Sequence, residues 1–209
     1  MKLFKTPRFF YWIFPRRTWG FSRSINKVYL TFDDGPDPEI TPWVLDFLKT
    51  KTIKATFFCV GSNVLLHPEL FERIKSEGHT IGNHTMNHEK GTKVSFSDYK
   101  KSIKDTKNLI ENNLFRPPYG RIKSWQSYQL SKQYRIIMWS WLSYDYDSNI
   151  SIELILEKAK KQISAGDILV LHDNQKVKDR VKIVLPELVQ IIQEKGFEFS
   201  KIEWEKCNS

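Results

Sequence analysis

The stretch Lys27-Val28-Tyr29-Leu30-Thr31-Phe32-Asp33-Asp34-Gly35-Pro36 joins six strand-like residues to two adjacent carboxylates and a Gly-Pro turn. Neighbouring residues of a regular strand point to opposite faces of a sheet, so both carboxylates can enter one site only where the backbone bends. Gly35 and Pro36 can supply that bend. Two carboxylates held close together can take different roles, one as metal ligand and one as base. An isolated motif of this kind is more often a solvated turn, so the rest of the chain decides its meaning.

Strand-like and helix-like segments alternate from residue 27 onward. We predict strands at Val28–Phe32, Ala55–Val60, His79–Ile81, Leu114–Arg116, Arg135–Trp139, Asp167–Leu171 and Phe197–Ile202. We predict helices at Thr41–Lys51, Pro68–Glu77, Ser97–Asn113 with Ser97 as N-cap, Ser124–Gln133, Ser151–Ser164 and Arg180–Lys195. This alternation predicts a single α/β domain with a parallel sheet. About seven such units suit a barrel better than an open sheet, although periodicity alone does not decide between the two, and in a barrel the chemistry lies where strands end.

The composition is that of an ordinary soluble globular protein, with 40% hydrophobic and 27% charged residues. A net charge of +9 favours an anionic partner such as a membrane surface, an acidic glycan or nucleic acid. The lysines are scattered at helical spacing, however, which favours a merely solvated basic surface, and no nucleic acid partner is expected. Cys59 lies in an apolar run and is expected to be buried, and Cys207 lies in the tail. Two such cysteines indicate neither a disulfide framework nor a cysteine metal site.

Residues 1–26 form an aromatic and basic segment ahead of the motif-bearing domain, which we place at residues 27–204. The segment at residues 9–17 runs from Phe9 through Trp12 to Arg16 and Arg17, and it could dock on a membrane interface. It could equally pack under the domain as a cover, which we favour. No signal-peptide core and no transmembrane span of about 20 residues is visible, so a cytoplasmic or membrane-peripheral location is expected.

His84-Thr85-Met86-Asn87-His88 is the second motif. Two histidines four residues apart lie on one face of a helical turn, the spacing by which two imidazoles grip one metal ion. Gly82 and Asn83 fit a tight turn that would let the pair face inward. Asp34 could supply a third ligand, and two histidines with one carboxylate leave open positions for water and substrate. Alone, such a pair is as often a chance feature of a surface.

Arg116-Pro117-Pro118-Tyr119-Gly120 is the third motif. The prolines hold the backbone, and Arg116 can form a paired-donor salt bridge to a carboxylate, for which Asp33 is the natural candidate. The Tyr119 N–H, held by this loop, could serve as an oxyanion donor. A structural proline turn is the alternative.

Two further motifs follow strands. The motif Gly166–Asp173 contains a strand of apolar residues that delivers His172 at its end, where it could act as general acid, although a single histidine after a strand is more often structural. The segment Trp139–Tyr146 contains enough aromatic residues to line a pocket. Taken alone, it indicates only core residues followed by a loop.

In this order and spacing, the five motifs resemble the polysaccharide deacetylase family, also called the NodB homology domain or carbohydrate esterase family four. The resemblance covers residues 27–202 and is most specific at Thr31–Pro36, His84–His88 and Arg116–Gly120. It implies a distorted β/α barrel, removal of N-acetyl groups from sugar polymers, and one divalent metal ion. Zinc is the expected ion, with cobalt, manganese and nickel as alternatives. The implied metal ligands are Asp34, His84 and His88.

The resemblance also implies roles for other residues. Asp33 is similar in position to the family's catalytic base, Arg116 to the residue that orients the base, and His172 to the catalytic acid. Residues implied to contact the substrate are Tyr119, Trp139 and Val170, the last in place of the usual leucine.

One position departs from the family pattern. The family usually places an aspartate three residues after Trp139, to tune the acidic histidine, and this chain has Leu142 there. We expect Asp145 or Asp173 to replace it, because every other part of the site is present.

The motifs therefore predict a metal-dependent hydrolase, expected to be a monomer, that deacetylates an N-acetylated glycan. One rival is an inactive glycan-binding module on the same fold, which only Leu142 favours. A second is an iron oxygenase with two histidines and one carboxylate, which would have no use for a second adjacent aspartate. The sequence does not identify the glycan.

Overall fold

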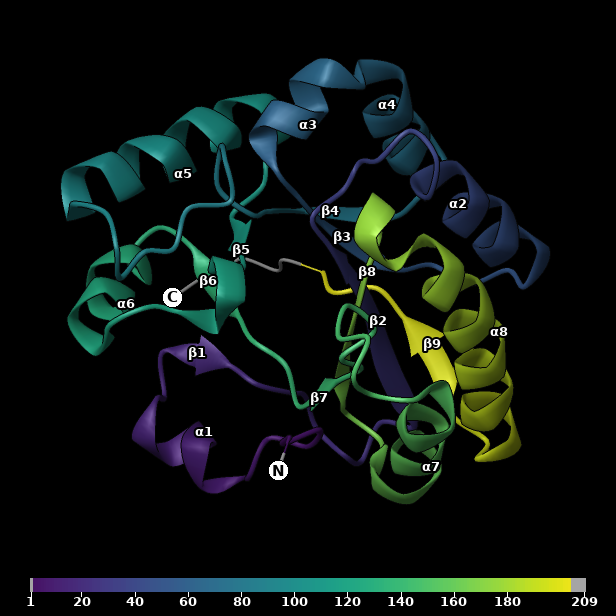
Figure 1. The fold of residues 1–209 in the computed structure, drawn as a ribbon. Coiled ribbons are helices and arrows are strands. Elements are labelled where there is room, and N and C mark those ends of the chain that lie inside the picture. The colour runs from purple at the N-terminus through teal and green to yellow at the C-terminus, as the bar shows by residue number, and fades with distance from the viewer. Residues whose placement is uncertain (1, 204–209) are drawn as a thin grey trace.

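Within residues 2–203, nine strands form one curled sheet, and all pairs between these strands are parallel. The computed structural model describes residues 2–203 (Figure 1). The strands are β1 (Arg17–Thr18), β2 (Lys27–Asp33), β3 (Thr56–Cys59), β4 (Thr80–Asn83), β5 (Leu114–Phe115), β6 (Arg135–Ile137), β7 (Trp141–Leu142), β8 (Ile168–His172) and β9 (Glu198–Ser200). Their order is β1-β6-β5-β4-β3-β2-β8-β7, with β9 also beside β2. The predicted distorted parallel (β/α) barrel is confirmed.

Helices surround the curled sheet (Figure 1). The α-helices are α1 (Phe9–Ile13), α2 (Thr41–Thr50), α3 (Gly61–Leu66), α4 (Pro68–Ser76), α5 (Phe96–Ile110), α6 (Ser124–Leu130), α7 (Ile152–Gln162) and α8 (Lys178–Glu194). Short 3-10 turns occupy η1 (Pro118–Gly120) and η2 (Gln175–Val177). Ser95, not Ser97, caps α5, because its hydroxyl accepts the Asp98 N–H and the helix starts one residue later.

The central strand β2 has one face in the apolar layer under the helices and the other face inside the curled sheet. Leu30 and Phe32 are fully buried in the cluster that the helices pack against. The alternate residues Thr31 and Asp33 point the other way, into the barrel. Asp33 at the end of β2 is in register with His172 at the end of the neighbouring strand β8, so two candidate functional residues end adjacent strands. Adjacent strand ends are therefore what position the site.

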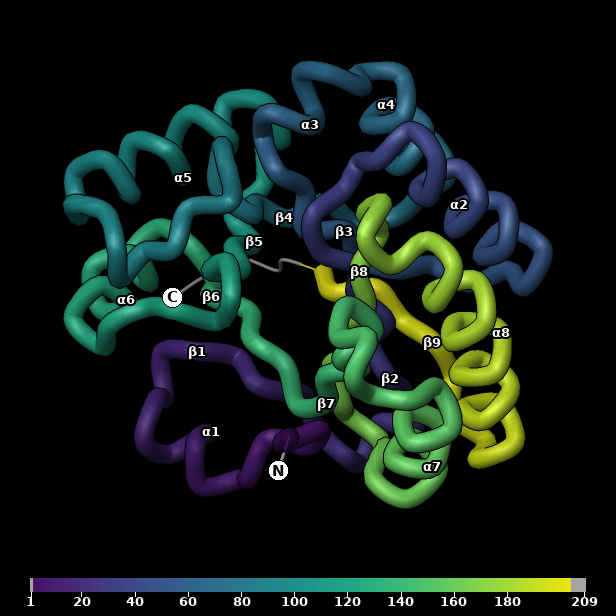
Figure 2. The backbone as a smooth tube through the Cα atoms, in the orientation of Figure 1, coloured from purple at the N-terminus to yellow at the C-terminus, as the bar shows by residue number. Residues whose placement is uncertain are grey.

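The beginning of the chain fills the space between β6 and β7 (Figure 2). Thr18 pairs with Ile137 of β6, while Lys5 bridges Trp141 of β7 and Gly20 bridges Asp167 just before β8. Phe4 and Trp19 are buried, so this segment packs as the favoured interpretation predicted. The packing does not cover α1 completely, since Phe9, Trp12 and Ile13 stay exposed.

Two other predictions concern cysteines and membrane spans. Cys59 is buried and free, as predicted, whereas Cys207 lies outside the described residues. Within residues 2–203, no helix is long and apolar enough to cross a bilayer.

Candidate active site

Asp33 and Asp34 diverge at the end of β2. Asp33 is the last strand residue, and Asp34 takes a left-handed backbone conformation with φ 83°. The predicted bend therefore begins at Asp34 itself, one residue before Gly35. This conformation is uncommon for a residue other than glycine, and aspartate is among the types that tolerate it. It turns the second carboxylate toward a different set of partners from the first.

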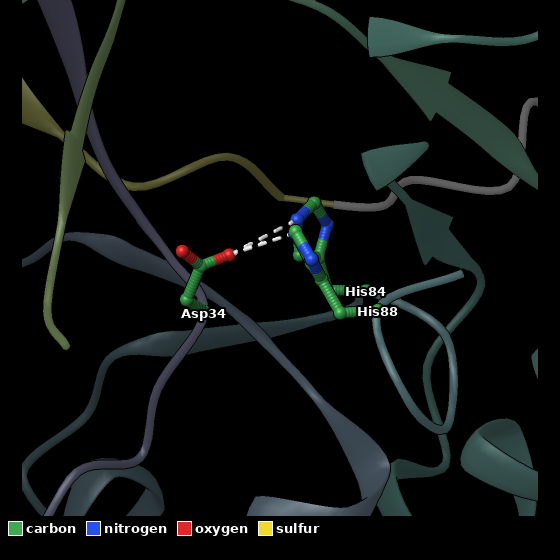
Figure 3. A group of neighbouring side chains, drawn as sticks. All are labelled: Asp34, His84 and His88. Carbon is green, nitrogen blue, oxygen red and sulfur yellow. Dashed lines mark ion pairs between the residues drawn. The ribbon is translucent and has the colours of Figure 1, made fainter. Parts of the chain in front are cut away.

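The second carboxylate meets the two predicted histidines (Figure 3). Oδ1 of Asp34 lies 3.1 Å from Nε2 of His88 and 3.5 Å from Nε2 of His84. Ligand atoms of the three residues lie within 4.8 Å of one another. His84 is buried, whereas His88 is partly exposed. Burial would raise the pKa of Asp34, but the neighbouring imidazoles outweigh burial and lower it below its usual range.

The hydrogen bonds of this group leave a position suited to a cation. Nδ1 of His84 lies 2.8 Å from the carbonyl oxygen of Arg116. A carbonyl oxygen only accepts, so Nδ1 carries a proton and Nε2 is the nitrogen of His84 that is left to ligate a metal ion on the side of Asp34. Oδ1 of Asp34 is itself buried and accepts no hydrogen bond from the described residues. Two imidazole nitrogens that converge on a buried carboxylate oxygen are a donor set that fits a metal ion.

The two histidines do not share a helical turn, so that part of the prediction was wrong. Residues 84–88 form a loop in which Thr85 and His88 both have positive φ, 66° and 58°. The side chain of Asn83 accepts the Thr85 N–H and shapes the loop. Gly82 lies within β4 rather than in a turn, and a Cβ there would meet the Phe58 ring at 2.4 Å.

Asp33 is held by Arg116, as predicted, but through one nitrogen rather than two. Nη1 of Arg116 donates to Oδ1 of Asp33 at 2.6 Å and to the Thr31 hydroxyl at 2.7 Å. Nη2 donates to the Met138 carbonyl, and the guanidinium lies 4.1 Å from the centroid of the Phe58 ring. Arg116 is fully buried, so the orientation of Asp33 is determined by a side chain that has little freedom to move.

His172 has a carboxylate partner despite Leu142. Nδ1 of His172 lies 2.7 Å from Oδ1 of Asp145, and the His172 N–H donates to Oδ2 at 2.8 Å. Leu142 is buried in β7, and the chain continues from there to bring Asp145 over the ring. Burial alone would lower the pKa of His172, but Asp145 outweighs burial and raises the pKa to about 9. The ring is therefore protonated at neutral pH, as a general acid requires.

Asp173, the other candidate partner of His172, has a different role. Its carboxylate accepts the Gly35 N–H at 3.1 Å and the Thr41 hydroxyl at 2.7 Å. A Cβ at Gly35 would lie 2.1 Å from Oδ2 of Asp173, so only glycine fits beside this carboxylate. Burial raises the pKa of Asp173 well above its usual range. Asp173 therefore braces the turn that presents Asp34.

The predicted substrate-contacting residues lie around this group. Tyr119 has φ 59°, and its exposed ring lies 4.6 Å from the His88 ring between centroids. Trp139 is partly buried and packs over Gly120. Val170 is buried in β8, two residues before His172 and therefore on the same face of the strand. Their functional roles stay predictions.

One polar contact was missed at the sequence level. Nδ2 of Asn174 donates to Oδ2 of Asp34 at 2.7 Å and so holds the oxygen that faces away from the histidines. A polar residue two positions after His172, in a loop that follows a strand end, was the available signal.

Comparisons with known proteins identify the family. A sequence profile described as polysaccharide deacetylase matches residues 22–136. A peptidoglycan-N-acetylglucosamine deacetylase of Bacillus cereus is 35% identical over 190 residues, covering 87% of this chain and 89% of that protein. A chitooligosaccharide deacetylase of Rhizobium leguminosarum bv. trifolii is 33% identical over 154 residues, covering 70% of this chain and 71% of that protein.

Solved structures agree. The Bc1960 peptidoglycan N-acetylglucosamine deacetylase, in complex with a naphthyl-substituted N-oxidanyl-benzamide, has a TM-score of 0.86 and 30% identity over 94% of this chain and 95% of that one. BA3943 from Bacillus anthracis, described as a CE4 family pseudoenzyme, has a TM-score of 0.78 over 89% of this chain and 67% of that one. Its 22% identity shows the fold alone. The matching profile, the identity to the relatives and the shared structure together show that this chain belongs to the polysaccharide deacetylase family.

Proposed function

We propose that this protein is a metal-dependent hydrolase that removes N-acetyl groups from an N-acetylated glycan. The observation that carries the proposal is the convergence of Asp34, His84 and His88 on one buried point with an unsatisfied carboxylate oxygen. The Asp33–Arg116 pair lies at the end of the same strand β2. The relatives named as deacetylases support the same reaction class.

A divalent ion would be held by Asp34, His84 and His88, where it would polarise the acetamide carbonyl and lower the pKa of a water molecule. Imidazole and carboxylate ligands suit zinc, the expected ion, and also cobalt, manganese and nickel. Two hydrogen bonds would orient these ligands. Asn174 donates to Oδ2 of Asp34, and Nδ1 of His84 donates to the Arg116 carbonyl.

The remaining residues divide the proton transfers. Asp33 takes a proton from the attacking water, and Arg116 holds its carboxylate in place while it does so. The Tyr119 N–H donates to the oxyanion that forms as the carbonyl carbon becomes tetrahedral. His172 gives its Nε2 proton to the amine as the carbon–nitrogen bond breaks, and Asp145 keeps the ring charged beforehand. Acetate and a free amine on the sugar are the products.

For the substrate, we propose a glycan containing N-acetylglucosamine. Relatives named as acting on peptidoglycan and on chitooligosaccharides share that sugar. The exposed Tyr119 and Tyr146 rings lie beside His88 and His172, where aromatic faces can stack on sugar rings. Trp139 and Val170 would form walls for the acetyl methyl group. We also propose that the protein acts as a monomer, which light scattering on the purified protein tests.

Neither rival has support of its own. The inactive-module hypothesis depended on Leu142, and Asp145 supplies the carboxylate that Leu142 lacks. The iron oxygenase hypothesis leaves Asp33 and its buried arginine without a role.

The test is acetate release from N-acetylglucosamine oligomers and from peptidoglycan, under air and without oxygen. We expect release that a chelator abolishes, that added zinc or cobalt restores, and that does not depend on oxygen. His84→Ala should lose both bound metal and activity, whereas His67→Ala, which changes a histidine outside the ligand group, should keep both. Metal content that is undiminished in His84→Ala would overturn the assignment of the ligands. Absence of acetate release from every acetylated glycan in a panel would overturn the proposed reaction.

An inhibitor offers a second test. The N-oxidanyl-benzamide bound by the Bc1960 deacetylase contains a hydroxamic acid, whose two oxygens chelate metal ions. We expect a hydroxamic acid of this kind to inhibit this protein, and the matching benzamide without the N-hydroxyl group to be far weaker. Equal potency of the two compounds would argue against inhibition through a metal.

A further inference from the structure

Helix α1 presents an apolar face to solvent. Phe9, Trp12 and Ile13 are spaced as neighbours on one side of the helix, and they are 54%, 87% and 59% exposed. The opposite side packs inward, with the Phe10 and Phe14 rings 5.7 and 6.3 Å from the ring of the buried Trp19. The inward rings anchor the helix, and Phe9 touches the Phe10 ring at 4.7 Å between centroids, so the outward side chains, here called the α1 face, are held in position while they stay largely exposed.

The α1 face lies in a part of the chain without negative charge. Residues 1–32 contain no aspartate or glutamate, and their cations are Lys2, Lys5, Arg8, Arg16, Arg17, Arg23 and Lys27. Arg8 and Arg16 flank α1 and are exposed, and neither forms an ion pair within residues 2–203. Asp167, which lies near Tyr11, is buried and paired with Lys5.

The positive region continues onto α6. The Arg16 guanidinium lies 4.6 Å from the centroid of the Tyr128 ring, and Arg17 donates to the Ser127 hydroxyl and the Ile122 carbonyl. Residues 112–144, which include α6, also contain no acidic residue. Tyr128 is exposed on α6, and the Lys132 ammonium lies 5.1 Å from its ring centroid. Two segments that contain no acidic residue and are far apart in sequence are therefore joined by contacts of Arg16 and Arg17 with α6, and both carry exposed aromatic side chains; together they are called the acid-free region.

We propose that the α1 face and the cations around it dock this protein on an anionic lipid bilayer. Aromatic side chains are favoured at the boundary between headgroups and hydrocarbon, and cations at that depth attract anionic headgroups. Ile13 and Phe9 distinguish a bilayer from a soluble polyanion. Binding a polyanion would need only the cations, whereas exposed aliphatic and phenyl groups are stabilised by leaving water for an acyl layer. This proposal is independent of the proposed deacetylation.

The experiment is sedimentation of the intact protein with phosphatidylcholine vesicles that contain or lack phosphatidylglycerol, at low and high salt. We expect binding to anionic vesicles at low salt, loss of binding at high salt, and little binding to neutral vesicles. The double variant Trp12→Ser with Ile13→Ser should bind at least about tenfold more weakly. Arg8→Gln and Arg16→Gln should each weaken binding by about fivefold, since each cation near the surface contributes about 1 kcal/mol.

Leu66→Ser is the matched control, because Leu66 is also an exposed apolar residue on a short helix but lies in α3, away from the acid-free region. It should bind vesicles like the original protein. All variants change exposed residues, and equal melting temperatures would verify folding.

Three outcomes would overturn the proposal. The first is no binding to anionic vesicles at low salt. The second is binding that the Trp12 and Ile13 substitutions leave unchanged and that soluble polyphosphate removes completely, which would indicate a polyanion site. The third is self-association of the free protein that the same substitutions abolish, which would show that a second copy covers the α1 face.

Discussion

Replacing Asp145 by asparagine should remove the charge that keeps His172 protonated. Asp145 accepts the two His172 N–H groups through different oxygens, so asparagine keeps the size of the side chain but can accept only one of them through its single oxygen. A shift from 6.5 to about 9 in the pKa of His172 corresponds to about 3 kcal/mol in favour of the imidazolium. Without Asp145, burial dominates and the pKa should fall to the ordinary value or below.

The magnitude follows from the protonated fraction at pH 8. A ring with the pKa of about 9 is about 90% protonated there, and one with the ordinary pKa of 6.5 is about 3% protonated. The variant should therefore lose about thirtyfold or more in kcat/KM at pH 8, and less at pH 6. The assay is acetate release from an N-acetylglucosamine oligomer across the pH range, where the alkaline limb should move to lower pH.

The dependence of folding stability on pH provides a second measure of the charge on His172. The pKa of His172 is higher in the folded protein than in the unfolded chain, so its contribution to stability is present below about pH 6.5. It is lost as pH rises through about 9. In Asp145→Asn, the free energy of unfolding, measured with denaturant, should therefore fall less as pH rises across this range. Asp173→Asn is the control, because Asp173 contacts Gly35 and Thr41 rather than the ring, and it should leave the alkaline limb in place. An unmoved limb in Asp145→Asn would refute the assignment of Asp145.

Three other substitutions test separate parts of the site. Asp33→Asn should keep bound metal but lose about 10²–10⁴-fold in turnover, measured with metal content on the same sample, and near-full activity would show that Asp33 is not the base. Asn174→Ala should weaken metal affinity by about 10–100-fold, measured by competition with a chelator, because Oδ2 of Asp34 loses its donor; unchanged affinity would show that the carboxylate is held without it. Gly35→Ala should lower the free energy of unfolding by at least about 1–3 kcal/mol, since its Cβ would lie 2.1 Å from Oδ2 of Asp173; an unchanged midpoint in denaturant would contradict that clash.

Much of the sheet could be predicted because its central strands are continuous apolar runs. Such runs at residues 55–60 and 168–171 are typical of strands covered on both faces. The strands β1 and β7 have only two residues each and carry no periodic pattern. Their place in the sheet depends on pairing between segments distant in sequence, since β1 pairs with β6, and β7 pairs with β8 and is bridged by Lys5.

The sequence predicts which residue types form the site and in what order, but it does not predict the backbone conformation that brings them together. The four-residue spacing of His84 and His88 suggests a helical turn, yet left-handed residues in a loop bring the rings together. Asp145 and Asp173 were equal candidates in the sequence. Only the fold distinguishes them, because β7 runs beside β8 and carries the chain back over His172. The contact between Asn174 and Asp34 likewise depends on loop conformation, which periodicity does not encode.

The position of the N-terminal segment between β6 and β7 has a consequence for association between molecules. Residues 4–21 satisfy backbone groups on both sides, including the Leu142 N–H, the Met138 N–H and the Gly166 carbonyl. A chain shortened to its motif-bearing part would expose those groups along two open strand edges. Open edges pair readily with strands of other chains, so the shortened chain should aggregate rather than simply unfold. The N-terminal segment, which contains none of the predicted catalytic residues, therefore covers the strand edges through which two molecules of this protein would otherwise pair.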